Sequence, residues 1–178
     1  MKAKKLTCIA LFICFAAVLS AAETWLPPIV PIAGVRVGLG NIVTLFVLYI
    51  GGGWRFCDAL SVALLRCVVA ALITGSVMSA AYGLAGGILA LCGMAAARKL
   101  LPSEKEQRYL PLTGACGAVC HIIGQLAVAV VFYGTLSVLA YTPILLATSV
   151  IGGVFTGLCT MLILAKLPTK LVSGLRNL

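Results

Sequence analysis

The feature that most constrains this chain is a series of long apolar runs separated by short polar segments. A helix that crosses a bilayer needs roughly 20 mostly apolar residues, so a chain of 178 residues accommodates about six. The composition agrees, because 62% of the residues are hydrophobic, 10% are charged and the mean hydropathy is +1.18. Soluble domains are typically about 45–50% apolar and about 25% charged. Lipid is therefore the expected solvent.

We predict an all-α integral membrane protein with one transmembrane domain over residues 1–178. The expected spans are approximately 6–22, 37–50, 59–77, 79–97, 110–136 and 143–164. The first run resembles a signal peptide. We expect it to be retained, because it is needed to place the later basic loops on one side. The second run is short, so we expect it to be tilted or to be completed by the proline-rich connection 23–36 before it.

The positions of the basic residues predict the orientation of the bundle. Basic residues concentrate in cytoplasmic loops, and six crossings that start inside give both termini a cytoplasmic location. Arg36 then lies in an outer loop and Arg66 within a span. The other eleven of the thirteen basic residues lie inside: Lys2, Lys4, Lys5, Arg55, Arg98, Lys99, Lys105, Arg108, Lys166, Lys170 and Arg176. No basic stripe is interleaved with aromatic residues, so we expect no nucleic-acid partner.

Arg66 is the one basic residue near the middle of an apolar run. A charged group at mid-bilayer costs about 2.5–3.5 kcal/mol on insertion scales, so such residues usually have a partner or line a cavity. Asp58 is about two turns away and Glu23 lies on the outer side. Two interpretations stay open: Arg66 binds an anionic or carbonyl-rich ligand, or it is tied structurally to backbone carbonyls or Glu23.

His121 and Gln125 are four residues apart, so they share one face of the expected fifth helix. Gly117 and Gly124 lie nearby. Such a face can present hydrogen-bonding groups to a ligand that approaches the backbone closely. The alternative is a hydrogen bond between helices.

A third polar group is the stretch 34–41, which contains Arg36, Asn41 and three glycines, with Glu23 upstream. It lies at the outer boundary of the second run. Irregular polar backbone at membrane depth is tolerated where it lines a cavity or is buried in protein. This stretch is therefore either the wall of a binding site or a tight re-entry turn.

The sequence indicates no catalytic centre. With four acids and one histidine, the chain has no paired carboxylates, no Asp-rich diphosphate–magnesium motif and no ATP-binding loop. Its eight cysteines include no CxxC pair and lie mostly in apolar runs, where cysteine packs as a small residue. We interpret Cys116 and Cys120, next to His121, in the same way. We expect no enzymatic activity, no cofactor and no metal.

Small residues recur at helical spacing in three runs, which allows membrane helices to approach closely. In the fourth and sixth runs we expect packing within the chain, through Ser79, Gly83 and Gly87, and through Ser149, Gly153 and Gly157. The first run carries Ala10, Cys14, Ala17 and Ala21. This terminal stripe could equally dock a partner protein.

Several segments resemble the heptaprenyl diphosphate synthase component I family, also called the Gx transporter family. The most specific segment is Glu23 with the proline-rich stretch through Pro31 and the motif 34–45. Segments 65–66, 82–87, 121–125 and 141–143 agree as well, and the resemblance covers roughly 6–164. The sequence lacks the Asp motifs of prenyltransferases, so we treat the enzyme name as a legacy of gene association.

This family is similar to the substrate-capturing S components of energy-coupling factor (ECF) transporters. The resemblance implies a six-helix bundle in the cell membrane that binds a vitamin-like solute near the outer face, energised by a membrane scaffold and two ATPases. The expected substrate-binding residues are Glu23, Arg36, Asn41, Arg66, His121 and Gln125. The stripe at Ala10, Cys14, Ala17 and Ala21 would dock the scaffold, with Cys14 a departure from the family's alanine pattern.

Two other functions stay open from the sequence. Relatives of the family are linked to flavin-based electron transfer, so the chain could be a membrane subunit of a flavin- or quinone-linked redox system. It could also be an accessory subunit of isoprenoid synthesis, for which it lacks the expected acids.

Overall fold

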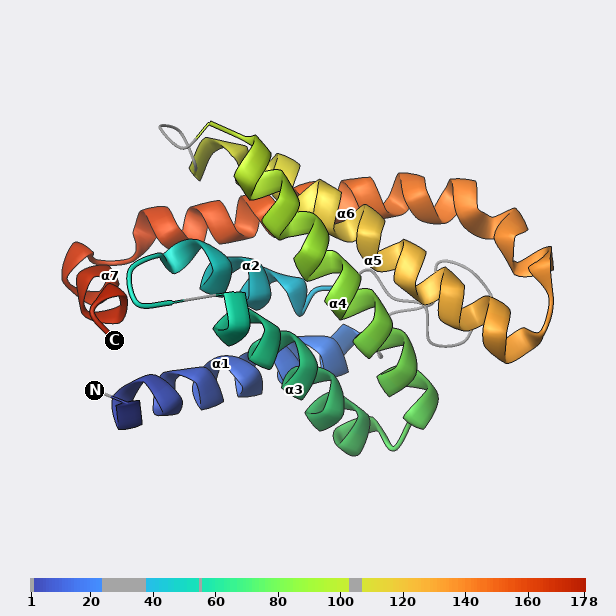
Figure 1. Cartoon of the computed structure of the whole chain (residues 1–178), viewed down its shortest axis with the longest axis horizontal. Coiled ribbons are helices and arrows are strands. Elements are labelled where there is room, and N and C mark those ends of the chain that lie inside the picture. The colour runs from blue at the N-terminus through green and yellow to red at the C-terminus, as the bar shows by residue number, and fades with distance from the viewer. Residues whose placement is uncertain (1, 24–37, 55, 103–106) are drawn as a thin grey trace.

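A computed structural model describes residues 2–23, 38–54, 56–102 and 107–178 (Figure 1). Within these ranges the chain is helical and contains no strand. Five helices are long and apolar enough to cross a membrane: α1 (Lys2–Ala22), α3 (Phe56–Thr74), α4 (Val77–Leu100), α5 (Leu110–Tyr133) and α6 (Thr142–Lys166). The prediction of an all-α, multi-pass membrane bundle is confirmed.

The second expected span differs from the others. Helix α2 (Asn41–Ile50) has ten residues, which gives a length of about 15 Å against a hydrocarbon core of about 30 Å. All of its residues except Ile42 are buried, and α1, α3, α4 and α6 pack around it. Helix α2 is therefore a half-length helix in the core of the bundle, and it begins inside the protein (Figure 1).

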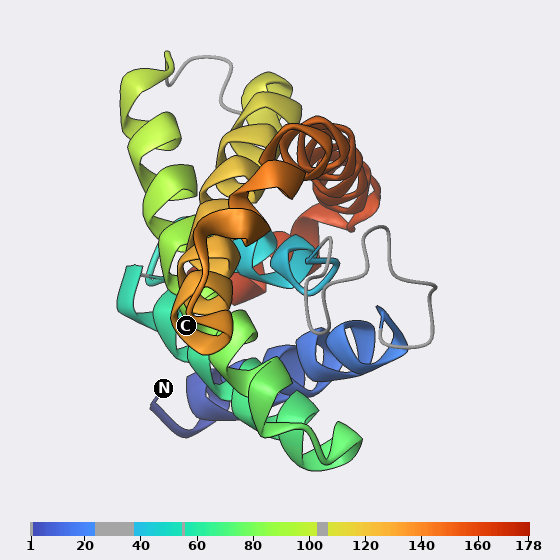
Figure 2. The same cartoon turned by 90° about the vertical axis from the view of Figure 1, so that its right-hand side faces the viewer.

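Short segments connect and extend the long helices. A 3-10 helix, η3 (Leu136–Tyr141), leads from α5 into α6, and the short helix α7 (Thr169–Arg176) follows α6. The main contacts between long helices join α4 to α5, α5 to α6, α1 to α3 and α3 to α4. Two views show that α5 and α6 run beside one another on the side of α2 away from α1 (Figures 1 and 2).

Glycines bring α5 and α6 into backbone contact. A Cβ atom added to Gly153 would lie 2.6 Å from the Cα of Ala115 and 2.6 Å from the carbonyl oxygen of Gly114. A Cβ at Gly157 would lie 2.5 Å from the Cα of Pro111. The small residues of α6 therefore pack within the chain, as predicted. In α4, a Cβ at Gly83 would lie 3.1 Å from the sulfur of Cys67 on α3.

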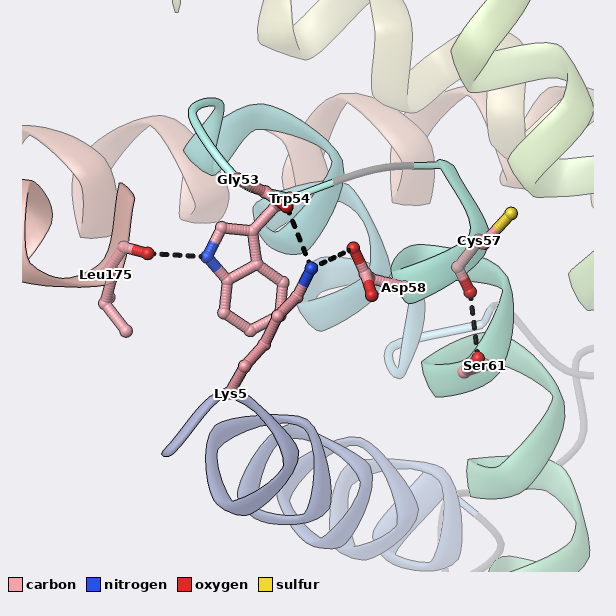
Figure 3. A network of polar contacts seen from close by, with 7 residues as sticks. All are labelled: Lys5, Gly53, Trp54, Cys57, Asp58, Ser61 and Leu175. Carbon is pink, nitrogen blue, oxygen red and sulfur yellow. Dashed lines mark hydrogen bonds and ion pairs between the residues drawn. The ribbon is translucent and has the colours of Figure 1, made fainter. Parts of the chain in front are cut away.

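Polar contacts join both ends of the chain to the connection between α2 and α3 (Figure 3). The Lys5 ammonium donates to the carbonyl oxygen of Gly53 at 2.8 Å and to the carboxylate of Asp58 at 2.7 Å. The indole N–H of Trp54 donates to the carbonyl oxygen of Leu175 at 2.8 Å. The termini therefore lie at one end of the bundle. The prevalence of basic residues at that end supports its predicted cytoplasmic location.

Arginine side chains bind the carboxyl end of α2. Arg176 Nε donates to the carbonyl oxygen of Ile50 at 2.8 Å, and Arg98 Nη1 donates to that of Leu48. The guanidinium of Arg98 also lies 4.8 Å from the centre of the Tyr49 ring. Cations near the C-terminus of a helix satisfy its last carbonyls and complement its dipole.

Candidate ligand-binding site

The first polar cluster lies where α2 begins. The first N–H groups of a helix have no partner within that helix. Here the Glu23 carboxylate, just beyond the end of α1, accepts the N–H of Gly38 at 2.6 Å and that of Leu39 at 3.0 Å. Glu23 is buried. Its negative charge and its two hydrogen bonds therefore hold the start of α2 against the outer end of α1.

Arg66 connects three helices. Its side chain is 3% exposed, and Nη1 donates to Ser20 Oγ of α1 at 2.8 Å while Nη2 donates to Asn41 Oδ1 of α2 at 2.7 Å. Asp58 pairs with Lys5, so it is not the partner of Arg66. The sequence also left open that Arg66 binds backbone carbonyls or Glu23. In the structure both of its hydrogen bonds go instead to neutral side chains.

His121 and Gln125 form the third part of the cluster. Their Nε2 atoms lie 3.0 Å apart and both side chains are buried. An amide nitrogen can only donate, so His121 Nε2 is the acceptor in this arrangement. A Cβ on Gly86 would lie 2.7 Å from His121 Nδ1 and Cε1, so this glycine lets α4 approach the ring. This hydrogen bond between His121 and Gln125 lies within α5. The alternative considered from the sequence was a hydrogen bond from this face to another helix.

Glu23, Arg66, His121 and Gln125 line one small cavity that is partly open to the surface. Its described lining comes from α1, α3, α4, α5 and the residues before α2: Ser20, Glu23, Gly38, Arg66, Cys67, Ala70, Ser79, Gly83, His121 and Gln125. Glu23 and Ser79 lie at helix ends on the predicted outer side, whereas Arg66 and His121 lie near the middle of their helices. The cavity therefore extends from the predicted outer side to about half the depth of the bundle.

The structure brings together five of the six expected substrate-binding residues: Glu23, Asn41, Arg66, His121 and Gln125. Arg36 lies outside the described residues. Sequence reasoning did not place Ser20 in the site and assigned Ser79 to helix packing, because an isolated serine on an apolar helix is not distinctive. Among the described residues no group of three His, Cys, Asp or Glu side chains could hold a metal ion.

The expected docking stripe on α1 is divided between two environments. Ala10 and Cys14 are exposed, Ala21 is half-buried and Ala17 is fully buried. Ala17 lies with Ile13, which belongs to the hydrophobic core. The part of the stripe toward the N-terminus, at Ala10 and Cys14, is therefore the most accessible to a partner.

Comparison with known proteins identifies the family. The model of the heptaprenyl diphosphate synthase component I family matches residues 12–163. The chain belongs to this family. The matched range contains every described residue of the cavity lining, so the site lies within the part of the chain that the family model covers. Neither a curated protein nor a solved structure matches the chain.

Gly38 provides a test of the site in this family member. It has a φ of +88°, which favours glycine, and a Cβ there would lie 2.8 Å from Asn41 Nδ2 and 3.3 Å from His121 Nε2. We expect Gly38→Ala to reduce the amount of bound solute by roughly tenfold, through a cost of about 1–2 kcal/mol at this position. Solute released from the purified protein and quantified by mass spectrometry measures the effect.

Gly75→Ala is the matched control. Gly75 also has a positive φ, +65°, but a Cβ there would meet nothing within 4 Å. We expect this variant to lower thermal stability without lowering solute content. An equal loss of solute in both variants would show that backbone strain alone, and not the site, produces the effect.

Proposed function

We propose that this chain is the membrane-embedded substrate-binding (S) component of an ECF-type uptake transporter. It captures a small solute on the outer side, and separate ATPase subunits supply the energy through a membrane scaffold. The observation that supports this most is the polar cavity at the start of α2. Four helices and the segment before α2 contribute its lining, and it extends toward the predicted outer side.

The chemistry of the cavity favours binding over catalysis. Burying polar groups in a membrane bundle is costly, so these groups are retained for a function. The cavity offers donors and acceptors from Arg66, His121, Gln125 and Ser79, which suit recognition of a polar solute. The Glu23 carboxylate already binds two backbone N–H groups, so it serves to position α2. We therefore propose a binding protein and not an enzyme.

An ATPase partner follows from the same proposal. The described residues form one membrane bundle, and the sequence carries no ATP-binding motif. The exposed part of the α1 stripe, at Ala10 and Cys14, offers small residues where a scaffold helix can approach closely.

Mass spectrometry of small molecules carried by the protein tests the proposal. The full chain is purified gently into lipid nanodiscs from cells grown in rich medium, denatured, and its released solutes are quantified. We expect one solute at near-stoichiometric amount. The double variant His121→Leu/Gln125→Leu is expected to lose it, and Thr135→Ala, at an exposed position outside the cavity, is expected to keep it. Absence of any solute from the wild-type protein would refute the proposal.

Co-purification tests the partner. Affinity purification of the intact chain from its own membranes is expected to recover a membrane scaffold and ATPase subunits. Recovery of a flavoprotein or quinone-linked complex in their place would support the redox alternative.

A further inference from the structure

We infer that the solute carries an oxyanion, a carboxylate or phosphate group, which binds the guanidinium of Arg66. This inference rests on the proposed function and names the substrate class for the same cavity. It begins from the charge of Arg66, which forms no ion pair with a described acid.

Neither described acid forms an ion pair with Arg66, although Glu23 lines the same cavity. Asp58, in the first turn of α3, forms the one ion pair found between described residues, with Lys5, whereas the cavity lining begins at Arg66 in that helix. Glu23 directs its two oxygens to the N–H groups of Gly38 and Leu39. No described carboxylate lies within 4.0 Å of an Arg66 nitrogen.

The hydrogen bonds of Arg66 do not neutralise it either. Nη1 and Nη2 donate to the neutral oxygens of Ser20 and Asn41, and Nε has no partner among the described residues. Neutral acceptors orient the guanidinium but leave its full positive charge in place. The side chain is 97% buried, as its 3% exposure implies, and it lines the cavity.

A buried charge of this kind is costly unless an opposite charge accompanies it. A purely structural link between Ser20 and Asn41 would need only a neutral donor. An oxyanion in the cavity would supply an opposite charge in direct contact with Arg66. The oxygens of a carboxylate or phosphate also match the N–H groups of the guanidinium better than the oxygens of a neutral ligand do. Ser20 and Asn41 hold the guanidinium in position, so they act as positioning residues.

Two matched pairs of small probes test the charge preference on the wild-type protein. The full chain is purified in chloride buffer, and its thermal unfolding is measured with acetate against acetamide, and with inorganic phosphate against chloride, at constant ionic strength. Acetate or phosphate is expected to raise the midpoint in a saturable way, and acetamide and chloride are not. Equal effects of acetate and acetamide, or no effect of either anion, would overturn the inference.

Variants assign the effect to Arg66. Arg66→Gln is expected to abolish the shift with acetate and phosphate, and Arg66→Lys to weaken the apparent affinity by about tenfold. Arg98→Gln, which removes a half-buried arginine outside the cavity, is expected to leave the shift unchanged. If Arg66→Gln does not fold, two measurements still test the role of Arg66. These are the affinity of Arg66→Lys relative to wild type and the response of the wild-type protein to the probe pairs. An undiminished shift in Arg66→Lys or Arg66→Gln would overturn the inference.

The charge of the natural solute separates this inference from the proposed function. Solutes released from the wild-type protein are fractionated by anion exchange at pH 7. A stoichiometric neutral solute would overturn the inference and leave the proposed function standing. No released solute, together with a saturable acetate shift that depends on Arg66, would support the anion site and count against the proposed function.

Discussion

Replacing Gly153 by leucine is expected to prevent α5 and α6 from packing and to leave little folded protein. Even a single methyl group at Gly153 would meet Ala115 Cα and the Gly114 carbonyl at 2.6 Å and Ala118 Cβ at 2.7 Å. Two of these three atoms belong to the backbone, so rotamer changes cannot relieve the overlap. Overpacking typically costs about 1–3 kcal/mol and occasionally more, and leucine adds three further carbons.

A graded series measures this effect. Gly153→Ala should lower the midpoint of chemical unfolding, and Gly153→Leu should yield protein that elutes as aggregate in size-exclusion chromatography. Gly174→Leu is the control, because a Cβ at Gly174 meets nothing within 4 Å. Alanine has a higher helix propensity than glycine by about 1 kcal/mol, so without the close contact Gly153→Ala would stabilise α6. A Gly153→Ala protein that is as stable as wild type, or more stable, would contradict close contact between the two helices.

The second large effect is expected for Glu23→Gln. The carboxylate accepts N–H groups from both Gly38 and Leu39, whereas the amide that replaces it has one oxygen and an NH₂ group that can only donate. One backbone N–H would then face another donor, at a cost of about 1–3 kcal/mol. We expect lower stability and at least a tenfold loss of bound solute, because the start of α2 also positions Asn41.

Asp58→Asn is the comparison for Glu23→Gln. It removes one described carboxylate from the opposite end of the bundle, where the partner is Lys5. We expect this variant to lose some stability and to keep its solute. Unchanged solute content in Glu23→Gln would show that its carboxylate does not shape the cavity.

The number of long apolar helices and their predicted orientation could be derived from the sequence. Both depend on the hydropathy and charge of single segments and not on contacts between segments. The same reasoning located Arg66, His121 and Gln125, since polar residues in apolar runs are conspicuous. The length of α2 could not be predicted in this way. The run 37–50 is mostly apolar, and hydropathy does not reveal that the helix starts only at Asn41.

Contacts between helices could also not be predicted from the sequence. Asp58 and Glu23 were both conceivable partners of Arg66, and only the packing shows that Lys5 pairs with Asp58 while Ser20 and Asn41 bind Arg66. Sequence reasoning used the basic tail after α6 only to orient the bundle and did not predict its contacts. In the structure this tail contains α7, and Leu178 packs against the hydrophobic core. The carbonyl oxygens of Leu175 and Arg176 accept hydrogen bonds from the Trp54 indole and the Gly53 backbone N–H.

The half-length α2 has a consequence for permeability. Below the cavity, Leu45, Val47 and Ile50 are almost completely buried, and the helix that carries them is about 15 Å long. Buried apolar side chains of this kind are a barrier to ions and water. On the proposed function, a solute in the cavity therefore reaches the cytoplasm only when α2 repacks or the whole bundle reorients in the membrane.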